Sequence, residues 1–503
     1  MIEIDCEHLT LDEVYAIANG EKARLAKSTL PKIKKSRAAV EKLLSAERPT
    51  YGINTGFGEL ANVRIKTEDA KQLQRNLILS HACGVGAPLS QEVVRAMICL
   101  RANALAKGFS GVRLEIVQTL IEMLNKNVVP VIPEQGSIGA SGDLVPLAHL
   151  ALVIIGEGEA TFNGKRMSGA EAMKSAGIAP LELMEKEGIA LINGTQMMCA
   201  LGVIALKRAE ALLKNAQIAA AASAEALKGT DQAFRAEIHE LRPHKGQIAV
   251  ADNMRRLTRN SEIVASHRDC PKVQDAYSIR CIPQVLGASK DAIGYVRGVL
   301  ETEINSATDN PLIFDFGAIS GGNFHGQPLA LALDFLGIAV AEIADIAERR
   351  IARLVDSKLS GLPLFLAEKG GLNSGLMIPQ YTAAALVSEN KVLAHPASVD
   401  SIPTSANMED HVSMGAIAAR KALKIVENAE NVVAIEYLCA AQALDFHKMK
   451  AGEGTQAAHE AVRKSVAHVG EDRVLAPDIQ NIREMMIDGA IIKEVERKVG
   501  KMK

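Results

Sequence analysis

Several long segments of this chain are apolar nearly all the way around a helix, and they constrain the fold more than any other feature. Residues 197–229 form an Ala- and Leu-rich stretch that ends at Gly229, and residues 327–356 form a second one. A third helical pattern extends from Asp410 to about Lys450. A helix that is apolar all round belongs inside a large protein, and small side chains let neighbouring helices approach closely. We therefore predict a mainly α fold with a central bundle of long helices, formed either within one chain or between subunits.

Strand patterns are few, and nothing in the chain reads as a linker. Residues 161–167 form a hairpin pattern that turns at Asn163-Gly164. No Gly/Ser-rich tract, charge block or fixed-period repeat divides the 503 residues. We therefore expect one interwoven unit over residues 1–503. The N-terminal part, at about 1–195, carries the reactive loop. A long-helix bundle follows at about 196–450, and a C-terminal helical part at about 451–503.

Charge and cysteine usage exclude several classes of partner. The net charge is −2, which argues against a nucleic-acid surface, because such surfaces are basic. The seven cysteines contain no C-x-x-C pair, which favours reduced thiols in the cytoplasm. The acidic start lacks the basic region of a signal peptide, and the apolar run 144–155 is too short to span a membrane. The twelve histidines show no metal-ligand spacing, so we expect no metal site.

The stretch Gly-Ala-Ser-Gly-Asp at 139–143 is the strongest candidate for chemistry. It fits a tight turn, a nucleophilic serine or a reactive backbone. The serine-hydrolase elbow is Gly-x-Ser-x-Gly after a buried strand, whereas position 143 is Asp and the upstream segment contains two prolines. A hydrolase is therefore poorly supported. The dinucleotide pattern at 56–61 also lacks the strand that it requires.

The surroundings of the tripeptide favour an electron-accepting group. Asp143 and Pro146 precede an apolar helical run, which places Ala140, Ser141 and Gly142 at a helix N-terminus, where negative charge is favoured. If the Gly142 nitrogen attacks the Ala140 carbonyl, a five-membered ring closes through Ser141. Loss of the Ser141 hydroxyl as water then leaves a conjugated methylene, and the unhindered glycine permits the strained turn.

The sequence resembles the histidine/phenylalanine/tyrosine ammonia-lyase family over most of its length. The matching blocks are 51–58, 79–86, 136–152, 187–196, 273–281, 308–314, 321–335, 348–356, 370–377 and 394–415. The resemblance implies a 4-methylidene-imidazol-5-one (MIO) group formed autocatalytically from Ala140, Ser141 and Gly142, with no external cofactor. It also implies a homotetramer in which each active site is built from three chains. The partner is then a small amino-acid substrate.

Catalytic roles follow from the resemblance, residue by residue. It implies that Tyr51 is the base that removes the β-proton, and that Tyr277 assists it or competes for that role. A tyrosine needs a depressed pKa to act near neutrality. Asn193 is expected to hydrogen-bond the prosthetic ring or the substrate amine, and Arg280 to hold the substrate carboxylate as a bidentate pair.

Substrate choice is implied by a second group of residues. The expected lining of the substrate pocket is His81, Gln274, Phe324, Met377 and Glu409. His81 and Glu409 can both hydrogen-bond an imidazole, whereas a phenyl ring would leave Glu409 without a partner. The predicted reaction is therefore elimination of ammonia from L-histidine to give trans-urocanate, the first step of histidine degradation. Met408 and Ala276 depart from the residues common in the histidine-specific members.

Three alternatives differ from this reaction. Within the family, the chain could act on tyrosine or phenylalanine, or be an aminomutase. The fumarase-like lyases are also helical tetramers, but their Gly-Ser-Ser-x-Met-Pro-x-Lys loop is not found in this sequence. A non-catalytic helical scaffold is the remaining reading, and a chain that never forms the prosthetic ring would support it.

Overall fold

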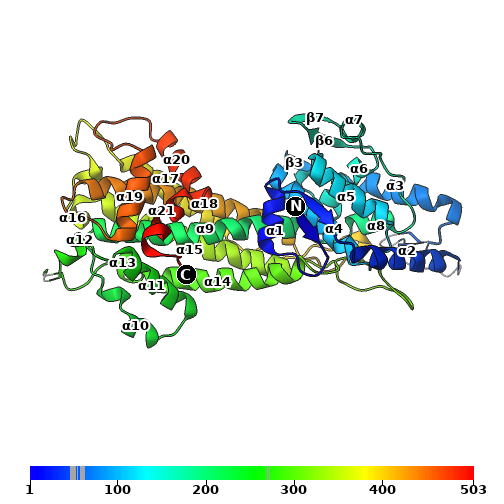
Figure 1. The fold of residues 1–503 in the computed structure, drawn as a ribbon, viewed down its shortest axis with the longest axis horizontal. Coiled ribbons are helices and arrows are strands. Elements are labelled where there is room, and N and C mark those ends of the chain that lie inside the picture. The colour runs from blue at the N-terminus through cyan, green and yellow to red at the C-terminus, as the bar shows by residue number, and fades with distance from the viewer. Residues whose placement is uncertain (46–51, 54, 57–59, 61–62, 269, 271) are drawn as a thin grey trace. The chain divides into compact units, whose positions relative to one another are not determined.

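The computed structural model describes residues 1–45, 52–53, 55–56, 60, 63–268, 270 and 272–503. These residues fold mainly into helices, with a few short strands, which confirms the predicted fold class (Figure 1). The chain divides into two compact units. The first consists of 1–204, 297–334 and 396–420, and the second of 205–296, 335–395 and 421–503. The prediction of one interwoven functional unit stays a prediction.

Four long helices contain four of the five boundaries between these units, and the fifth, at 395/396, follows α17 (Met377–Leu393). The four helices are α9 (Gln196–Ala226), α14 (Ile282–Glu303), α15 (Gln327–Val355) and α18 (Gly415–Asp445). Three of them lie where the apolar segments of the sequence predict a helix. The helix α18 is continuous, but it begins five residues after Asp410 and ends at Asp445.

The first unit places short strands and helices around the start of α9. Its helices are α1 (Leu11–Ala18), α2 (Thr29–Ser45), η2 (Thr67–Asp69), α3 (Ala70–His81), α4 (Gln91–Ala106), α5 (Leu114–Lys126), α6 (Leu144–Ile154), α7 (Gly169–Ser175), α8 (Glu187–Ile192) and η5 (Ser405–Asn407). Within this unit, Gly202 of α9 lies against Leu300 of α14 and Leu333 of α15, where an added Cβ would come within 3.1 Å of each leucine. Glycine at this point therefore lets the long helices pack closely.

The strands of the first unit form four small sheets. They are β1 (Ile2–Ile4) with parallel β2 (Ala23–Leu25), β3 (Val85–Pro88) with β5 (Pro133–Gln135), β4 (Val129–Pro130) with β6 (Glu159–Phe162) and β7 (Lys165–Ser168), and β8 (Leu312–Phe314) with β9 (Gly317–Ile319). The β6–β7 pair confirms the hairpin predicted at Asn163-Gly164, since Phe162 pairs with Lys165 across a two-residue turn.

Among its described residues, the regular elements of the second unit are all helices, and loops join them. Besides its parts of the long helices, it contains η3 (Gln232–Phe234), α10 (Ala236–Glu240), α11 (Lys245–Leu257), α12 (Glu262–Ala265), α13 (Tyr277–Arg280), α16 (Ser357–Ser360), η4 (Leu364–Leu366), α17 (Met377–Leu393), α19 (Glu453–Ser465), α20 (Ala476–Ile487) and α21 (Ala490–Val499). A fully buried ion pair joins α15 to α18, because Arg350 meets the Glu436 carboxylate at 2.5 and 2.9 Å. Ser223 of α9 donates to the same carboxylate at 2.8 Å.

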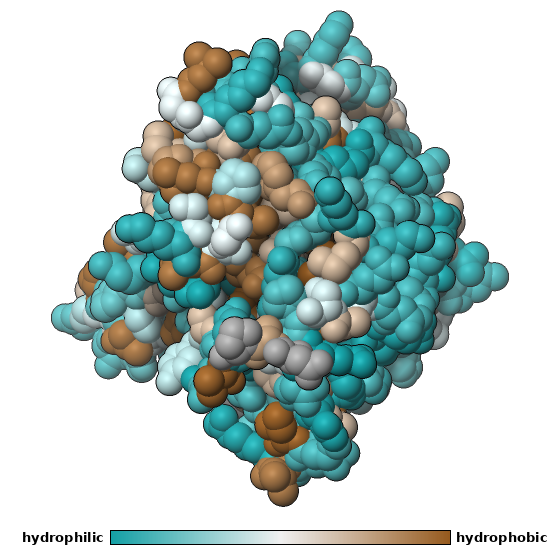
Figure 2. Space-filling model, turned by 90° about the vertical axis from the view of Figure 1, so that its left-hand side faces the viewer, coloured by the Kyte–Doolittle hydropathy of each residue, from teal (hydrophilic) through white to brown (hydrophobic). Residues whose placement is uncertain are grey.

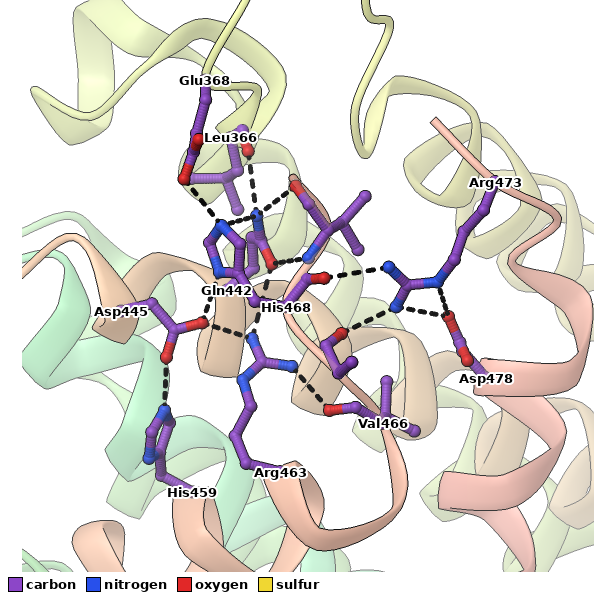
Figure 3. A network of polar contacts seen from close by, with 12 residues as sticks. Leu366, Glu368, Gln442, Asp445, His459, Arg463, Val466, His468, Arg473 and Asp478 are labelled. Atoms are coloured by element: carbon purple, nitrogen blue, oxygen red, sulfur yellow. Dashed lines mark hydrogen bonds and ion pairs between the residues drawn. The ribbon is translucent and has the colours of Figure 1, made fainter. Parts of the chain in front are cut away.

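A second polar network gathers at the end of α18 (Figure 3). The Asp445 carboxylate accepts from the imidazoles of His459 and His468, each at 2.7 Å, and from Arg463 at 2.8 Å. Burial alone would raise the pKa of Asp445, but these hydrogen bonds and the charge of Arg463 hold it well below its ordinary value. The other nitrogen of His468 faces the Glu368 carboxylate at 3.0 Å. One carboxylate thus ties the α19 helix and the segment after it to α18.

Candidate active site

The tripeptide 140–142 lies in a tight left-handed turn directly before α6. Ser141 has φ +51° and Gly142 has φ +79°, both in the region that side chains disfavour. The helix begins at Leu144, as the sequence predicts from Asp143. Gly142 forms an isolated bridge with Gly194, and the Asp143 amide donates to the Gly194 carbonyl at 2.7 Å. The turn is therefore held against the segment that precedes α9.

Gly142 is confined by its neighbour as well as by its backbone angle. A Cβ added at Gly142 would lie 2.2 Å from the carbonyl oxygen of Gly194 and 2.6 Å from its carbonyl carbon. Gly139, at the start of the same turn, has φ +77°, and a Cβ there would lie 2.1 Å from the Ser413 hydroxyl. Both glycines are needed for the close approach, and not only for the turn.

Asp143 supports α9 rather than the helix it precedes. Its side chain makes no capping hydrogen bond to α6. Instead, the fully buried carboxylate accepts from the Met198 amide in the first turn of α9 at 2.9 Å and from the Ser137 hydroxyl at 3.2 Å. Burial raises the pKa of the Asp143 carboxyl to about 7, against the hydrogen bonds that lower it. Asp143 therefore precedes α6, as predicted, but its side chain binds to α9.

Glu409 meets the reactive turn from a distant part of the sequence. The Ser141 hydroxyl donates to one Glu409 oxygen at 2.9 Å, and the Thr404 hydroxyl donates to the other at 2.9 Å. Residues 405–407 all have positive φ, so this carboxylate is presented by a strained loop. Burial lowers the pKa of the His81 imidazole, and the charge of nearby Glu409 opposes that shift. The first unit therefore brings Ser141, Glu409 and His81 together.

Asn193 lies at the end of α8, one residue before Gly194. Its amide nitrogen donates to the Asn310 carbonyl at 3.0 Å. Its oxygen Oδ1 is buried and has no hydrogen-bond partner among the described residues. A buried acceptor without a donor is costly, which makes this oxygen a place where a ligand N–H fits.

Arg101 is a supporting residue that the sequence analysis does not identify. It is fully buried in α4, and its guanidinium donates to the Gln196 side chain at 2.8 Å, to the Asn193 carbonyl at 3.3 Å and to the Thr308 carbonyl at 3.1 Å. It also donates to the Ala190 carbonyl. A charged residue inside the apolar run of α4 was the signal available in the sequence, because buried arginines are nearly always paired.

The second unit holds three of the predicted residues on or beside α13. Arg280 lies over the ring of Tyr277, with 4.5 Å between the guanidinium carbon and the ring centroid. Tyr277 is 71% exposed, and Gln274 is also exposed. The Arg280 Nε is buried without a partner among the described residues. An arginine with free donors beside an exposed tyrosine is suited to a carboxylate ligand.

The remaining predicted residues lie apart or outside the described residues. Met377 is the first residue of α17 in the second unit. Phe324 is half-buried in the first unit, next to His325, whose ring lies 5.8 Å from that of His411. Tyr51 lies outside the described residues. The first unit therefore brings the tripeptide together with Asn193, His81 and Glu409, whereas Phe324 shares the unit with them.

In the first unit, the tight turn at 140–142 lies with polar groups that can recognise a polar ligand. The turn carries no side chain larger than serine, and Gly139 and Gly142 are buried against Ser413 and Gly194. The Glu409 carboxylate, the His81 imidazole and the unpartnered amide oxygen of Asn193 are the polar groups that accompany it. Among the described residues, they do not form a metal-binding cluster. No group of metal-binding side chains occurs among the residues that the structure describes. Likewise, no helix within those residues is long and apolar enough to cross a membrane.

Comparison with known sequences defines the class of protein. The model of the family described as aromatic amino acid lyase matches residues 9–464. This match covers most of the chain, so the chain belongs to the aromatic amino acid lyase family. It is a carbon–nitrogen lyase.

Individual relatives show which members of the family this chain is similar to. The chain is 58% identical to a histidine ammonia-lyase of Alkaliphilus oremlandii, over 99% of both chains, and 53% identical to one of Natranaerobius thermophilus, over 100% of both. Its fold matches the crystal structure of histidine ammonia-lyase from Trypanosoma cruzi with a TM-score of 0.92 and 45% identity, covering 99% of this chain and 95% of that one. It also matches tyrosine aminomutase from Streptomyces globisporus with a TM-score of 0.95 and 38% identity, over 100% of both chains.

Proposed function

We propose that this protein eliminates ammonia from L-histidine and releases trans-urocanate. The observation that carries the proposal is the position of Glu409, whose carboxylate reaches the Ser141 hydroxyl at 2.9 Å. An imidazole N–H can donate to such a carboxylate, whereas a phenyl or phenol ring in the same orientation leaves it without that partner. The names of the relatives at more than 50% identity support the same substrate.

We propose that Ala140, Ser141 and Gly142 mature into an MIO group. The residues present fit such a ring, because Ser141 and Gly142 already have left-handed backbone angles and Gly142 leaves its nitrogen unhindered. Asn193 directly precedes Gly194, which forms the bridge with Gly142. Its Oδ1 has no hydrogen-bond partner among the described residues, so it can accept an N–H beside the turn. The MIO group, once formed, supplies an electrophile that makes the amine of an amino acid a better leaving group.

The chain's own residues bind and orient the substrate and move its proton. Glu409 and His81 hold the imidazole, and Arg280 holds the carboxylate. Tyr51 is the proposed base, with Tyr277 as assistant or competitor for that role. The rest of the pocket is lined by Gln274, Phe324 and Met377. Elimination then needs the β-proton to leave from the face that the tyrosine reaches.

We propose a homotetramer in which the active site is shared between chains. Large apolar side chains are exposed on α15, where Leu331, Phe335 and Ile338 form a helical stripe with exposed fractions of 49%, 43% and 44%. The ring of Tyr295 lies beside that of Phe335, at 5.9 Å. A space-filling view of one face shows hydrophobic residues gathered between hydrophilic ones (Figure 2). Apolar surface of this kind is typical of subunit interfaces. As a separate point, we propose that the protein works in the cytoplasm.

Three measurements test the proposal. Ultraviolet spectra recorded with histidine, tyrosine and phenylalanine as substrates should show product only from histidine. Product from tyrosine or phenylalanine alone would assign the alternative within the family. Intact mass should be lower than the sequence mass by two waters, and Ser141→Ala should restore the sequence mass and abolish activity. Full activity of Ser141→Ala would refute the mechanism, and analytical ultracentrifugation tests the tetramer.

A further inference from the structure

A cavity of about 360 Å³ lies in the first unit, lined by neither the tripeptide nor any residue of the proposed substrate pocket. Four parts of the unit form it, namely the segment between β1 and α1, α2, the turn after α4 and the β8–β9 hairpin. Its lining residues are Glu7, Lys32, Lys35, Ser36, Ala39, Lys107, Gly108, Phe109, Ile313, Phe314, Asp315 and Phe316. It has an aromatic wall and a charged rim, which are the two features that recognise a small amphipathic ligand.

Three phenylalanines form the aromatic wall. Phe314 and Phe316 are stacked with ring centroids 5.4 Å apart and planes only 8° from parallel, and Phe109 lies 5.5 Å from Phe314. Phe316 is 79% exposed, although a large aromatic side chain is usually buried. Ile313 anchors the hairpin below, since its amide donates to the Phe109 carbonyl at 2.8 Å. The near-parallel rings of Phe314 and Phe316 therefore offer a preformed aromatic face to a planar ligand, and Phe109, tilted by 52°, supports it from the side.

The rim carries one more positive than negative charge. Glu7 holds two lysines, with 3.0 Å to the Lys32 ammonium and 2.8 Å to the Lys107 ammonium. Lys35 pairs with Asp315 at 2.7 Å. Three lysines against two carboxylates leave an excess of one positive charge, which one monoanion neutralises. The hydrogen bonds from Lys107 and Lys32 hold the pKa of Glu7 below its ordinary value, so this carboxylate stays charged at neutral pH.

We propose that this cavity binds a planar unsaturated monocarboxylate, with its ring on the phenylalanine wall and its carboxylate at the lysines. This is the chemical class of the product that the proposed function assigns to the enzyme, and to that extent the inference rests on the proposed function. An amino-acid substrate is a zwitterion without net charge, so the excess positive charge favours product over substrate.

The hairpin connects this cavity to Asn193. At its base, the Asn310 side-chain oxygen accepts from the Gly321 amide at 2.7 Å and from the Ser320 hydroxyl at 3.2 Å, so both ends of the hairpin are tied to one residue. The carbonyl of Asn310 accepts the Asn193 amide at 3.0 Å. A ligand on the aromatic wall contacts the β8–β9 hairpin, and Asn310 at the base of this hairpin holds the Asn193 side chain. The cavity is therefore a site for feedback by the product class.

Binding is tested by isothermal titration of the intact oligomer with trans-cinnamate, with neutral cinnamamide as the matched ligand. Wild type should take up cinnamate at a second class of site in addition to the substrate pocket. Lys32→Met should weaken that class about fivefold and Glu7→Gln should strengthen it about fivefold, because each changes the rim by one charge. Lys42→Met, on α2 outside the cavity lining, is the matched control and should have no effect.

Phe316→Ser removes the exposed wall and should abolish the second class of site without unfolding the protein. A single class of site that is unchanged in all these variants would overturn the inference, as would equal binding of cinnamamide. In kinetic assays, inhibition by cinnamate should be mixed in wild type and purely competitive in Phe316→Ser. Binding is measured without turnover, so loss of histidine elimination would refute the proposed function while leaving this site intact.

Discussion

Replacement of Gly142 by alanine should destabilise the protein far more than the backbone angle alone explains. At φ +79° the added Cβ would lie 2.2 Å from the Gly194 carbonyl oxygen, which is 1.2 Å inside the 3.4 Å at which ordinary contact begins. That oxygen cannot retreat freely, because it accepts the Asp143 amide at 2.7 Å. The left-handed angle costs an alanine about 1–2 kcal/mol, and relief of the overlap by backbone shifts adds about 1–3 kcal/mol. We expect a total of about 2–5 kcal/mol.

Gly164 provides the matched control for this variant. It has φ +74° at the β6–β7 turn, and an added Cβ there would meet nothing within 4 Å. Gly164→Ala therefore carries the backbone cost of about 1–2 kcal/mol without the overlap. The difference between the two variants isolates the contact between Gly142 and Gly194.

Scanning calorimetry of both variants and intact mass of each supply the measurements. Gly142→Ala should unfold at a clearly lower temperature than Gly164→Ala. It should also keep the sequence mass, because the Gly142 nitrogen is the proposed attacking atom and would be displaced and hindered. Equal unfolding temperatures for the two variants would refute the steric reasoning. A Gly142→Ala chain lighter by two waters would refute the role given to the unhindered nitrogen.

Three further variants test buried polar groups by unfolding temperature. Asp445→Asn should lose about 2–4 kcal/mol at neutral pH, because Arg463 loses its countercharge and the amide replaces a carboxylate oxygen that accepts hydrogen bonds. The pKa of Asp445 is lowered, so this stability is present above the ordinary value of 3.8 and is lost as pH falls below it (Figure 3). A gap between variant and wild type that stays constant down to acid pH would contradict this assignment. The pKa of Asp143 is raised to about 7, so wild type should lose stability relative to Asp143→Asn as pH rises from 3.8 to about 7 and then level off. A flat difference would contradict it. Arg101→Lys should lower both the unfolding temperature and kcat, since an ammonium cannot reach the same acceptors as the planar guanidinium. An unchanged kcat would remove Arg101 from the support of the active site.

Local patterns predicted the elements of the fold well, because each depends on neighbouring residues. The apolar segments identified α9 and α15 to within about three residues, and Asn163-Gly164 identified the hairpin between β6 and β7. The helix start after Asp143 also followed from local signals. What local patterns could not predict is the partner of a side chain. Asp143 reads as a first-turn acid, yet its carboxylate serves a helix that begins 53 residues later, as the hydrogen bond to Met198 shows.

The candidate site shows the same limit more sharply. The tripeptide was recognisable because its chemistry is contained in three consecutive residues. Its contact with Glu409 spans 268 residues and depends on a strained loop, which no periodicity encodes. The charge of Arg101 within an apolar run was visible in the sequence, but its partners were not, because its guanidinium binds carbonyls from two separate segments, the end of α8 and Thr308. Glu409 was identified from the resemblance to the family. The matching blocks relate residues that are far apart in the sequence, whereas periodicity in one sequence reports only on neighbouring residues.

Two helix starts meet at the tripeptide, which favours the electron-accepting group proposed there. The bridge between Gly142 and Gly194 joins the residues just before α6 and just before α9, so the positive ends of both helices lie at the turn. A full negative charge on Asp143 would cancel part of that field. Burial opposes this cancellation, because it raises the pKa of the carboxyl to about 7 and leaves it only partly ionised at neutrality. The same burial that costs stability as pH rises therefore preserves the positive potential on which an electrophile at Ser141 depends.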